Sequence, residues 1–216
     1  MNRGPLIVFE GIDGCGKSTQ LRRAADRLRA VGFDPVETRE PTDGPWGRKI
    51  RAMARSSEPV APETELAWFI EDRREHMRAV VTPALDEGRI VLSDRSYLST
   101  VAYQGARGLD AEAILADSEA MFERPKLALL FVLSPAEGLA RVQARGGTSE
   151  PVFENRPFQE RVAAGFERLE VDGLVRIRAD RDEEQIAVDV WRAIAGLVVR
   201  EDATGAETSL SRDPAV

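Results

Sequence analysis

The sequence has little of what a disulfide framework or a structural zinc site requires. It contains one cysteine, Cys15, and one histidine, His76, among 216 residues. A single cysteine cannot form an intrachain disulfide, and one Cys with one His cannot supply the ligands of a structural zinc site. We therefore expect a protein of a reducing compartment, which favours the cytoplasm.

Long apolar runs and an excess of basic residues are also missing. No stretch approaches the roughly 20 apolar residues that span a bilayer, and Met1–Phe9 lacks the features of a signal peptide. The 37 acidic residues outnumber the 30 basic ones, giving a formal net charge of −7. Because nucleic-acid-binding proteins usually carry a basic excess, we expect neither nucleic acid nor membrane as a partner. A small anionic ligand fits this balance better.

The chain has the length and composition of one α/β domain, with 43% hydrophobic and 31% charged residues. Apolar, strand-like runs alternate with amphipathic stretches, and this pattern predicts a parallel sheet with right-handed crossovers. The expected strands are Leu6–Phe9, Phe33–Thr38, Arg89–Ser93, Leu127–Leu133 and Leu174–Arg178. The expected helices are Ser18–Val31, Gly47–Arg55, Pro62–Leu85, Tyr97–Gln104, Asp110–Phe122, Pro135–Arg145, Phe158–Leu169 and Asp182–Val199.

We expect residues 1–199 to form one domain. Residues 145–157 are polar and contain glycine, which suggests a short mobile lid. Residues 200–216 are polar without periodicity, so we expect a disordered tail.

Residues Gly11–Ser18, here called the P-loop, match the pattern G-x-x-x-x-G-K-[ST] between an expected strand and an expected helix. Glycines allow backbone N–H groups to turn towards phosphate oxygens, Lys17 reaches the β- and γ-phosphates, and the Ser18 hydroxyl ligates Mg²⁺. A glycine-rich turn with a surface lysine would not explain the full spacing. The residues expected to contact ATP are Gly11, Ile12, Asp13, Gly14, Cys15, Gly16, Lys17, Ser18 and Thr19.

A P-loop does not by itself separate a kinase from a GTPase or a motor ATPase. The Asn-Lys-x-Asp segment with which GTPases typically read guanine is absent from the sequence. Arginines that follow the expected strands indicate a second anionic ligand, which favours a kinase.

Five segments resemble the thymidylate kinase (dTMP kinase) family, and the resemblance extends from Leu6 to about Leu169. They are Phe9–Thr19, Thr38–Pro41, Lys49–Arg51, Phe69–Arg73 and Asp94–Gly105. The resemblance implies a three-layer P-loop NTPase fold with about five parallel strands. It also implies transfer of a phosphoryl group from ATP to dTMP with Mg²⁺, by an enzyme that commonly forms homodimers.

The resemblance assigns roles near the transferred phosphate. Asp94 would hold Mg²⁺ through its water shell, and Asp13 would lie near the acceptor sugar and phosphate. The residues that would hold the acceptor monophosphate are Arg95, Arg39 and Arg51. Taken singly, Asp94 could be a helix N-cap, and each arginine a solvated surface residue.

The resemblance also assigns the base and the sugar. Phe69 would stack on thymine, and Arg73, four residues later on the same helical face, would reach its O4. The groups similar to those that hydrogen-bond the base edge are Gln104, Ser99 and Thr100. Tyr103 would lie against the sugar and disfavour a ribose 2′-hydroxyl.

Two segments depart from the family pattern. The common Arg-Glu-Pro-Gly-Gly-Thr is here Arg39–Gly44, with the acidic Asp43 beside the acceptor loop. Some members place an arginine at the position of Gly14, so here the lid would supply the catalytic charge. The candidates are Arg145 and Arg156, and Arg141 could face the adenine side.

Two alternatives remain open at this point. The departure at Asp43 leaves room for a kinase of another nucleoside monophosphate, such as dUMP. The altered lid leaves room for a P-loop regulatory module without transfer activity.

Overall fold

The computed structural model describes residues 3–56, 60–146, 153 and 155–202. Five parallel strands form one sheet in the order β2-β3-β1-β4-β5. The strands are β1 (Leu6–Glu10), β2 (Val36–Arg39), β3 (Val91–Asp94), β4 (Leu127–Val132) and β5 (Leu174–Arg178). The expected α/β class and parallel five-stranded sheet are therefore confirmed.

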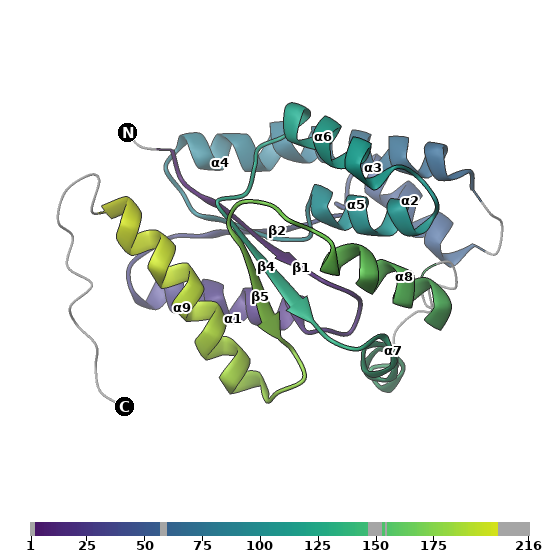
Figure 1. The fold of residues 1–216 in the computed structure, drawn as a ribbon. Helices are drawn as coiled ribbons and strands as arrows, with labels where there is room; N and C mark the ends of the chain where they lie inside the picture. The colour runs from purple at the N-terminus through teal and green to yellow at the C-terminus, as the bar shows by residue number, and fades with distance from the viewer. Residues whose placement is uncertain (1–2, 57–59, 147–152, 154, 203–216) are drawn as a thin grey trace.

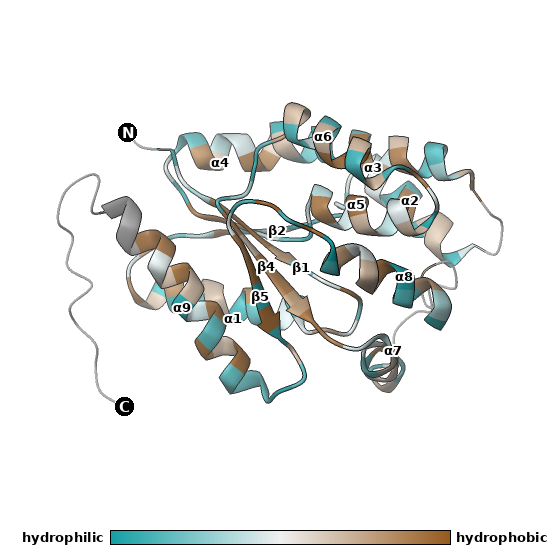
Figure 2. Ribbon diagram, in the orientation of Figure 1, coloured by the Kyte–Doolittle hydropathy of each residue, from teal (hydrophilic) through white to brown (hydrophobic). Residues whose placement is uncertain are grey.

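The burial of each strand explains its place in the sheet. All five residues of β1 are buried, as a continuous apolar run between two neighbouring strands requires. Strand β2 alternates half-buried Val36 and Thr38 with exposed Glu37 and Arg39, which suits the edge position that it occupies. Figure 2 shows the apolar strands at the centre of the molecule and polar residues on the outer sides of the helices.

Helices cover both faces of the sheet, which gives three layers (Figure 1). Helices α1 (Lys17–Ala30) and α9 (Glu183–Asp202) pack together on one face. The other helices are α2 (Pro45–Arg55), α3 (Pro62–His76), α4 (Thr82–Asp86), α5 (Tyr97–Ala106), α6 (Ala111–Met121), α7 (Pro135–Ala144) and α8 (Arg156–Glu167). Within the described part of the chain, no helix is both long and apolar enough to cross a membrane.

Three expected elements differ clearly from the structure. The strand expected over Phe33–Thr38 is shorter and runs over Val36–Arg39. The helix expected over Pro62–Leu85 is interrupted by a π-helical turn, η1 (Met77–Val81), between α3 and α4. Pro83 explains the interruption, because proline has no N–H to donate and its ring displaces the carbonyl one turn earlier. Helix α9 continues to Asp202, three residues beyond the expected end, and the rest of the expected tail lies outside the described residues.

The strand register brings the candidate residues to one edge of the sheet. Phe9 of β1 and Arg39 of β2 both pair with Asp94 of β3. The segments that follow these three strands therefore begin at the same level, at the carboxyl ends where ligands bind in parallel sheets.

Gly47 in α2 gives a stability prediction. A Cβ atom at Gly47 would lie 1.9 Å from the Thr42 backbone oxygen, whereas one at Gly196 in α9 would meet no atom within 4 Å. We expect Gly47→Ala to lower the free energy of unfolding by about 2 kcal/mol or more in urea denaturation. The matched control Gly196→Ala should raise it by about 0.5–1 kcal/mol. Equal effects of the two substitutions would contradict the close contact.

Candidate active site

The P-loop connects β1 to α1 and has the backbone of an anion-binding loop. Gly11, Gly14 and Gly16 adopt φ values of 134°, 81° and 97°, which residues with a side chain rarely adopt. Lys17 is 6% exposed, and its ammonium group donates to the carbonyls of Gly11 (3.0 Å) and Ile12 (2.9 Å). The loop therefore holds a buried cation beside the N-terminus of a 14-residue helix, an arrangement that suits a polyphosphate.

Cys15 packs inside the P-loop and is 1% exposed. Burial raises the pKa of its thiol, so the thiol stays protonated near neutral pH. Cys15 is therefore a small buried residue of the loop rather than a reactive thiol.

Helix α7 packs directly against the P-loop. A Cβ atom at Gly14 would lie 2.2 Å from the Gly138 carbonyl oxygen, and one at Gly138 would lie 2.6 Å from that of Asp13. The two backbones thus touch where neither residue has a side chain, and the position of α7 supports the shape of the loop.

Ser18 and Asp94 form the candidate magnesium position. The Ser18 hydroxyl donates to the Asp94 carboxylate, so the first turn of α1 and the end of β3 present two oxygen ligands side by side. No group of three or more His, Cys, Asp and Glu suited to a metal occurs among the described residues. Mg²⁺ fits such a sparse site, because it usually keeps several waters and shares its coordination with substrate phosphates.

A cavity of about 380 Å³ lies next to the P-loop and brings together most of the residues expected to bind the acceptor. Its size falls in the range of small-molecule sites. Its lining includes Asp13, Arg39, Arg51, Phe69, Arg73, Arg95, Ser99, Thr100, Tyr103 and Gln104. Glu40 and Phe153 also line it, although the sequence analysis gave them no role.

Arg95 occupies the end of the cavity next to the P-loop. Its guanidinium donates to Asp13 (2.5 Å), Ser99 (2.9 Å) and the hydroxyl of Tyr103 (3.3 Å). Its φ of 79° lies in the left-handed region, which costs a non-glycine residue about 1 kcal/mol or more. Arg95 is therefore held in a strained backbone conformation where β3 ends and α5 begins.

Glu10 supports this end of the cavity from behind. The buried carboxylate of Glu10 accepts from the hydroxyls of Ser96 (2.7 Å) and Ser99 (2.5 Å), and burial raises its pKa. Glu10 therefore orders the start of α5. The structure places Ser99 beside Arg95, and its predicted contact with the base stays a prediction.

Arg73 also lines the cavity and is 1% exposed. It forms an ion pair with Glu40 at 2.7 Å, and its Nη2 donates to the Thr100 hydroxyl at 2.9 Å. Glu40 also contacts His76 Nδ1 at 2.9 Å, and His76 Nε2 lies 2.6 Å from the Thr38 hydroxyl. Burial alone would raise the pKa of Glu40, but the charge of Arg73 and the contact with His76 outweigh it and lower that pKa.

Two residues that line the cavity, Arg73 and Gln104, each have a buried side-chain atom without a partner. Nη1 of Arg73 and Oε1 of Gln104 have no hydrogen bond among the described residues. Unpaired buried groups are costly, so such atoms commonly mark the place of a ligand or water. One is a donor and the other an acceptor.

Asp43 pairs with the two arginines expected to hold the acceptor phosphate. Its carboxylate lies 2.8 Å from Arg39 Nη2 and 3.0 Å from Arg51 Nη2. The hydrogen bond from Arg39 lowers the pKa of Asp43, so Asp43 is ionised near neutral pH. The departure from the family pattern thus places an anion between two arginines that line the cavity.

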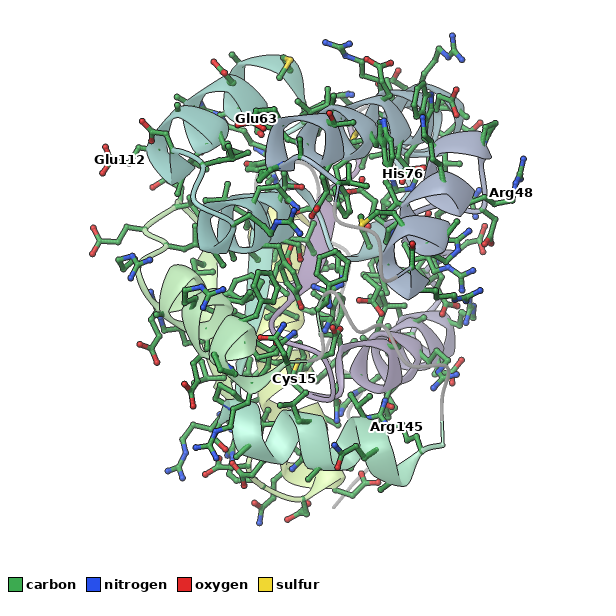
Figure 3. The ribbon with its side chains drawn as sticks, turned by 90° about the vertical axis from the view of Figure 1, so that its right-hand side faces the viewer. Cys15, Arg48, Glu63, His76, Glu112 and Arg145 are labelled. Carbon is green, nitrogen blue, oxygen red and sulfur yellow. The ribbon has the colours of Figure 1, made fainter. Side chains whose placement is uncertain are left out.

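The two candidate lid arginines do not line the cavity in its described part. Arg145 is exposed after the end of α7 (Figure 3), and Arg156 pairs with Glu160 at 2.9 Å. Arg141 donates to the Ala179 carbonyl, and nothing tests its predicted position near adenine. Phe153 is buried and packs edge-on against Tyr103, with ring centroids 5.7 Å apart. Residues 147–152 and 154 of the expected lid lie outside the described residues.

Comparisons with known proteins agree with this geometry. A family model described as thymidylate kinase matches residues 9–190. The chain belongs to the thymidylate kinase family. It is similar to the thymidylate kinase of Desulfotalea psychrophila, with 40% identity over 197 residues, 91% of this chain and 97% of that relative. It is also similar to the thymidylate kinase of Xanthomonas campestris pv. campestris, with 42% identity over 183 residues, 85% of this chain and 79% of that relative.

Membership of the thymidylate kinase family confirms the resemblance found in the sequence. The roles of individual residues are not tested by it and rest on the geometry above. Sequence reasoning missed the supporting residues of this site, among them Glu40, Glu65 and His76. Glu65 carried one usable signal, because it precedes Phe69 by four residues on the same helix.

Glu40→Gln tests the buried ion pair between Glu40 and Arg73. The substitution leaves the Arg73 charge buried without its partner, so we expect the free energy of unfolding at pH 7 to fall by about 3 kcal/mol. Because the pKa of Glu40 is lowered, its stabilising effect is complete above the ordinary value of 4.5 and is lost as the pH falls through the folded-state pKa.

Urea denaturation of wild type and variant between pH 3 and 7 measures this difference. It should be constant above about pH 5 and shrink below it. Glu87→Gln, at an exposed glutamate, serves as the control and should change the stability by less than about 0.5 kcal/mol. A difference between wild type and Glu40→Gln that does not depend on pH would contradict the assignment.

Gly138→Ala tests the contact of α7 with the P-loop. The added methyl group must displace Asp13 or the helix, so we expect a loss of roughly 10- to 100-fold in kcat/KM for ATP. Alanine favours helix more than glycine does, so α7 itself is not weakened. Gly196→Ala makes the same chemical change in open space and should leave steady-state kinetics unchanged. Wild-type kinetics for Gly138→Ala would refute the contact.

Proposed function

We propose that this protein transfers the γ-phosphoryl group of ATP to dTMP, giving ADP and dTDP, with Mg²⁺ as cofactor. The observation that carries the proposal is a pair of unpaired buried atoms on residues that line the cavity, the donor Arg73 Nη1 and the acceptor Gln104 Oε1. Family membership supports the same activity.

The donor and the acceptor match one edge of a pyrimidine. Thymine and uracil present O4, an acceptor, next to N3–H, a donor, so O4 would accept from Arg73 and N3–H would donate to Gln104. Cytosine presents an amino group, a donor, and an unprotonated N3, an acceptor. The amino group would face the donor of Arg73, and N3 would face the acceptor of Gln104, so neither hydrogen bond could form. Phe69 lines the same cavity and offers a ring on which the base can stack.

Three arginines of the cavity lining would bind the acceptor phosphate. Arg95 lies beside the P-loop, and Arg39 and Arg51 line the same cavity, so their guanidinium groups can hold a phosphate near the donor. Phosphoryl transfer depends mainly on positioning and charge stabilisation, so no strong base is needed. Asp43 forms ion pairs with Arg39 and Arg51 in the structure. The acceptor phosphate would compete with the Asp43 carboxylate for these two guanidinium groups.

Ser18 and Asp94 would hold Mg²⁺, which would supply positive charge to neutralise the phosphates. Lys17 would stabilise the charge that develops on the transferred group. Arg145 or Arg156 would add a further positive charge if residues 145–157 close over the site as a lid. We further propose that residues 1–199 form one domain and that the protein acts as a homodimer in the cytoplasm.

ADP release measured with dTMP, dUMP, dCMP, dAMP and dGMP tests the proposed function. We expect strong ATP-dependent release with dTMP, weaker release with dUMP and little with the others. Lys17→Ala should lower kcat by about 100-fold or more, because Lys17 acts on the transferred phosphoryl group. Lys126→Ala removes an exposed lysine at the start of β4 and should leave kcat unchanged.

Two outcomes would overturn the proposal. Faster release with dCMP or a purine nucleotide than with dTMP would refute the assigned base edge. Nucleotide binding without acceptor-stimulated ADP release would show a binding module rather than a kinase.

A further inference from the structure

Glu65 is a buried carboxylate that contacts Gln104, a residue of the cavity lining. It lies in the first turn of α3, its side chain is 0% exposed, and it is not among the residues that line the cavity. Its Oε1 accepts from Nε2 of Gln104 at 2.7 Å. Its Oε2 lies 3.3 Å from Nη1 of Arg107 in an ion pair rather than a hydrogen bond. A buried acid in this position needs an explanation beyond packing.

An ionised carboxylate determines which way a neighbouring amide points. A carboxylate can only accept hydrogen bonds, whereas a glutamine side chain has a donor on nitrogen and an acceptor on oxygen. Beside ionised Glu65, the amide of Gln104 must present its nitrogen, which leaves Oε1 as the remaining atom. The reverse orientation would set two oxygen acceptors against each other in a buried place, which is costly.

Arg107 supplies the positive charge that faces the Glu65 carboxylate. Burial raises the pKa of Glu65 above its ordinary value, and the charge of Arg107 limits that rise. Arg107 is itself held by a hydrogen bond of 2.6 Å to the Val60 carbonyl. A protonated Glu65 could donate as well as accept, and the amide could then adopt either orientation. The three side chains therefore act in series, from Arg107 through Glu65 to Gln104.

We propose that Glu65 is a positioning residue that fixes the amide of Gln104 with its oxygen available to the base, and so makes the site select a ring that carries N3–H. This inference rests on the proposed function. It adds that the readout of N3 depends on a carboxylate outside the cavity, whereas the readout of the C5 methyl group does not.

Two ratios of kcat/KM separate these readouts. The ratio of dTMP to 5-methyl-dCMP compares acceptors that differ only in the N3 and C4 groups. The ratio of dTMP to dUMP compares acceptors that differ only in the C5 methyl group. Glu65→Gln keeps the size of the side chain but lets it donate to Oε1 of Gln104, so the amide can turn its nitrogen towards N3.

We expect Glu65→Gln to lower the ratio of dTMP to 5-methyl-dCMP by about tenfold, the value of one buried hydrogen bond. The ratio of dTMP to dUMP should stay within about twofold of wild type, because the methyl contact is untouched. Glu63→Gln, an exposed glutamate two residues earlier (labelled in Figure 3), makes the same change of charge in the same helical turn. It should behave as wild type in both ratios.

A wild-type ratio of dTMP to 5-methyl-dCMP in Glu65→Gln would overturn the proposal, and so would an equal fall in both ratios. If Glu65→Gln does not melt cooperatively, Arg107→Gln tests the same series of contacts. It should lower the dTMP to 5-methyl-dCMP ratio in the same direction, and an unchanged ratio would again overturn the proposal. Turnover of dTMP by wild type, measured in the same experiment, reports separately on the proposed function.

Discussion

The buried ion pair between Glu40 and Arg73 is the interaction on which the proposed base-binding part of the cavity depends. It joins the segment after β2 to α3, and Arg73 extends the connection to α5 through Thr100. On the other side, Glu40 reaches His76 and, through it, Thr38 in β2. Burying two charges is costly, and the surrounding hydrogen bonds offset that cost. Because the Glu40 carboxylate neutralises the charge of Arg73, one guanidinium nitrogen, Nη1, can remain without a hydrogen-bond partner.

The same arrangement occurs three times around the cavity. Glu40, Glu10 and Glu65 are each buried, and each holds a polar side chain of the cavity wall: Arg73, Ser99 and Gln104, respectively. The pKa values of these three carboxylates are shifted in different directions. The pKa of Glu40 is lowered by its two partners, whereas burial raises the pKa of Glu10 and of Glu65. Glu10 and Glu65 hold their partners from outside the cavity lining, whereas Glu40 is itself part of that lining.

Local sequence was sufficient for the parts of the fold that depend on local chemistry. The P-loop was identified from its spacing, and the apolar runs of β1 and β4 predicted their strands to within a residue or two. The helix expected over Pro62–Leu85 contains Pro83, but the form of the interruption, a π-helical turn, depends on how α3 and α4 pack. The end of α9 was placed too early because a polar terminus gives no periodic signal.

The candidate site could be predicted as a set of residues but not as a set of contacts. Most residues that line the cavity follow from the family segments, since three of the five segments begin at the carboxyl ends of β1, β2 and β3 and the other two lie in α2 and α3. Their pairings do not follow, because they join residues far apart in the chain. Asp43 raised doubt as an added negative charge, and only the structure shows that it lies between Arg39 and Arg51. Glu65 had no visible role until its distance to Gln104 was known.

The contact between Gly14 and Gly138 limits how this enzyme can change during evolution. Some relatives carry an arginine in the P-loop, but a side chain at Gly14 would collide with the backbone of α7. Replacing Gly138 cannot relieve the collision, because the atom in the way is a main-chain oxygen. A single substitution at Gly14 therefore cannot place a longer side chain in the P-loop while α7 keeps its position. Such a change needs a displacement of the whole helix first, so the loop and α7 can only change together.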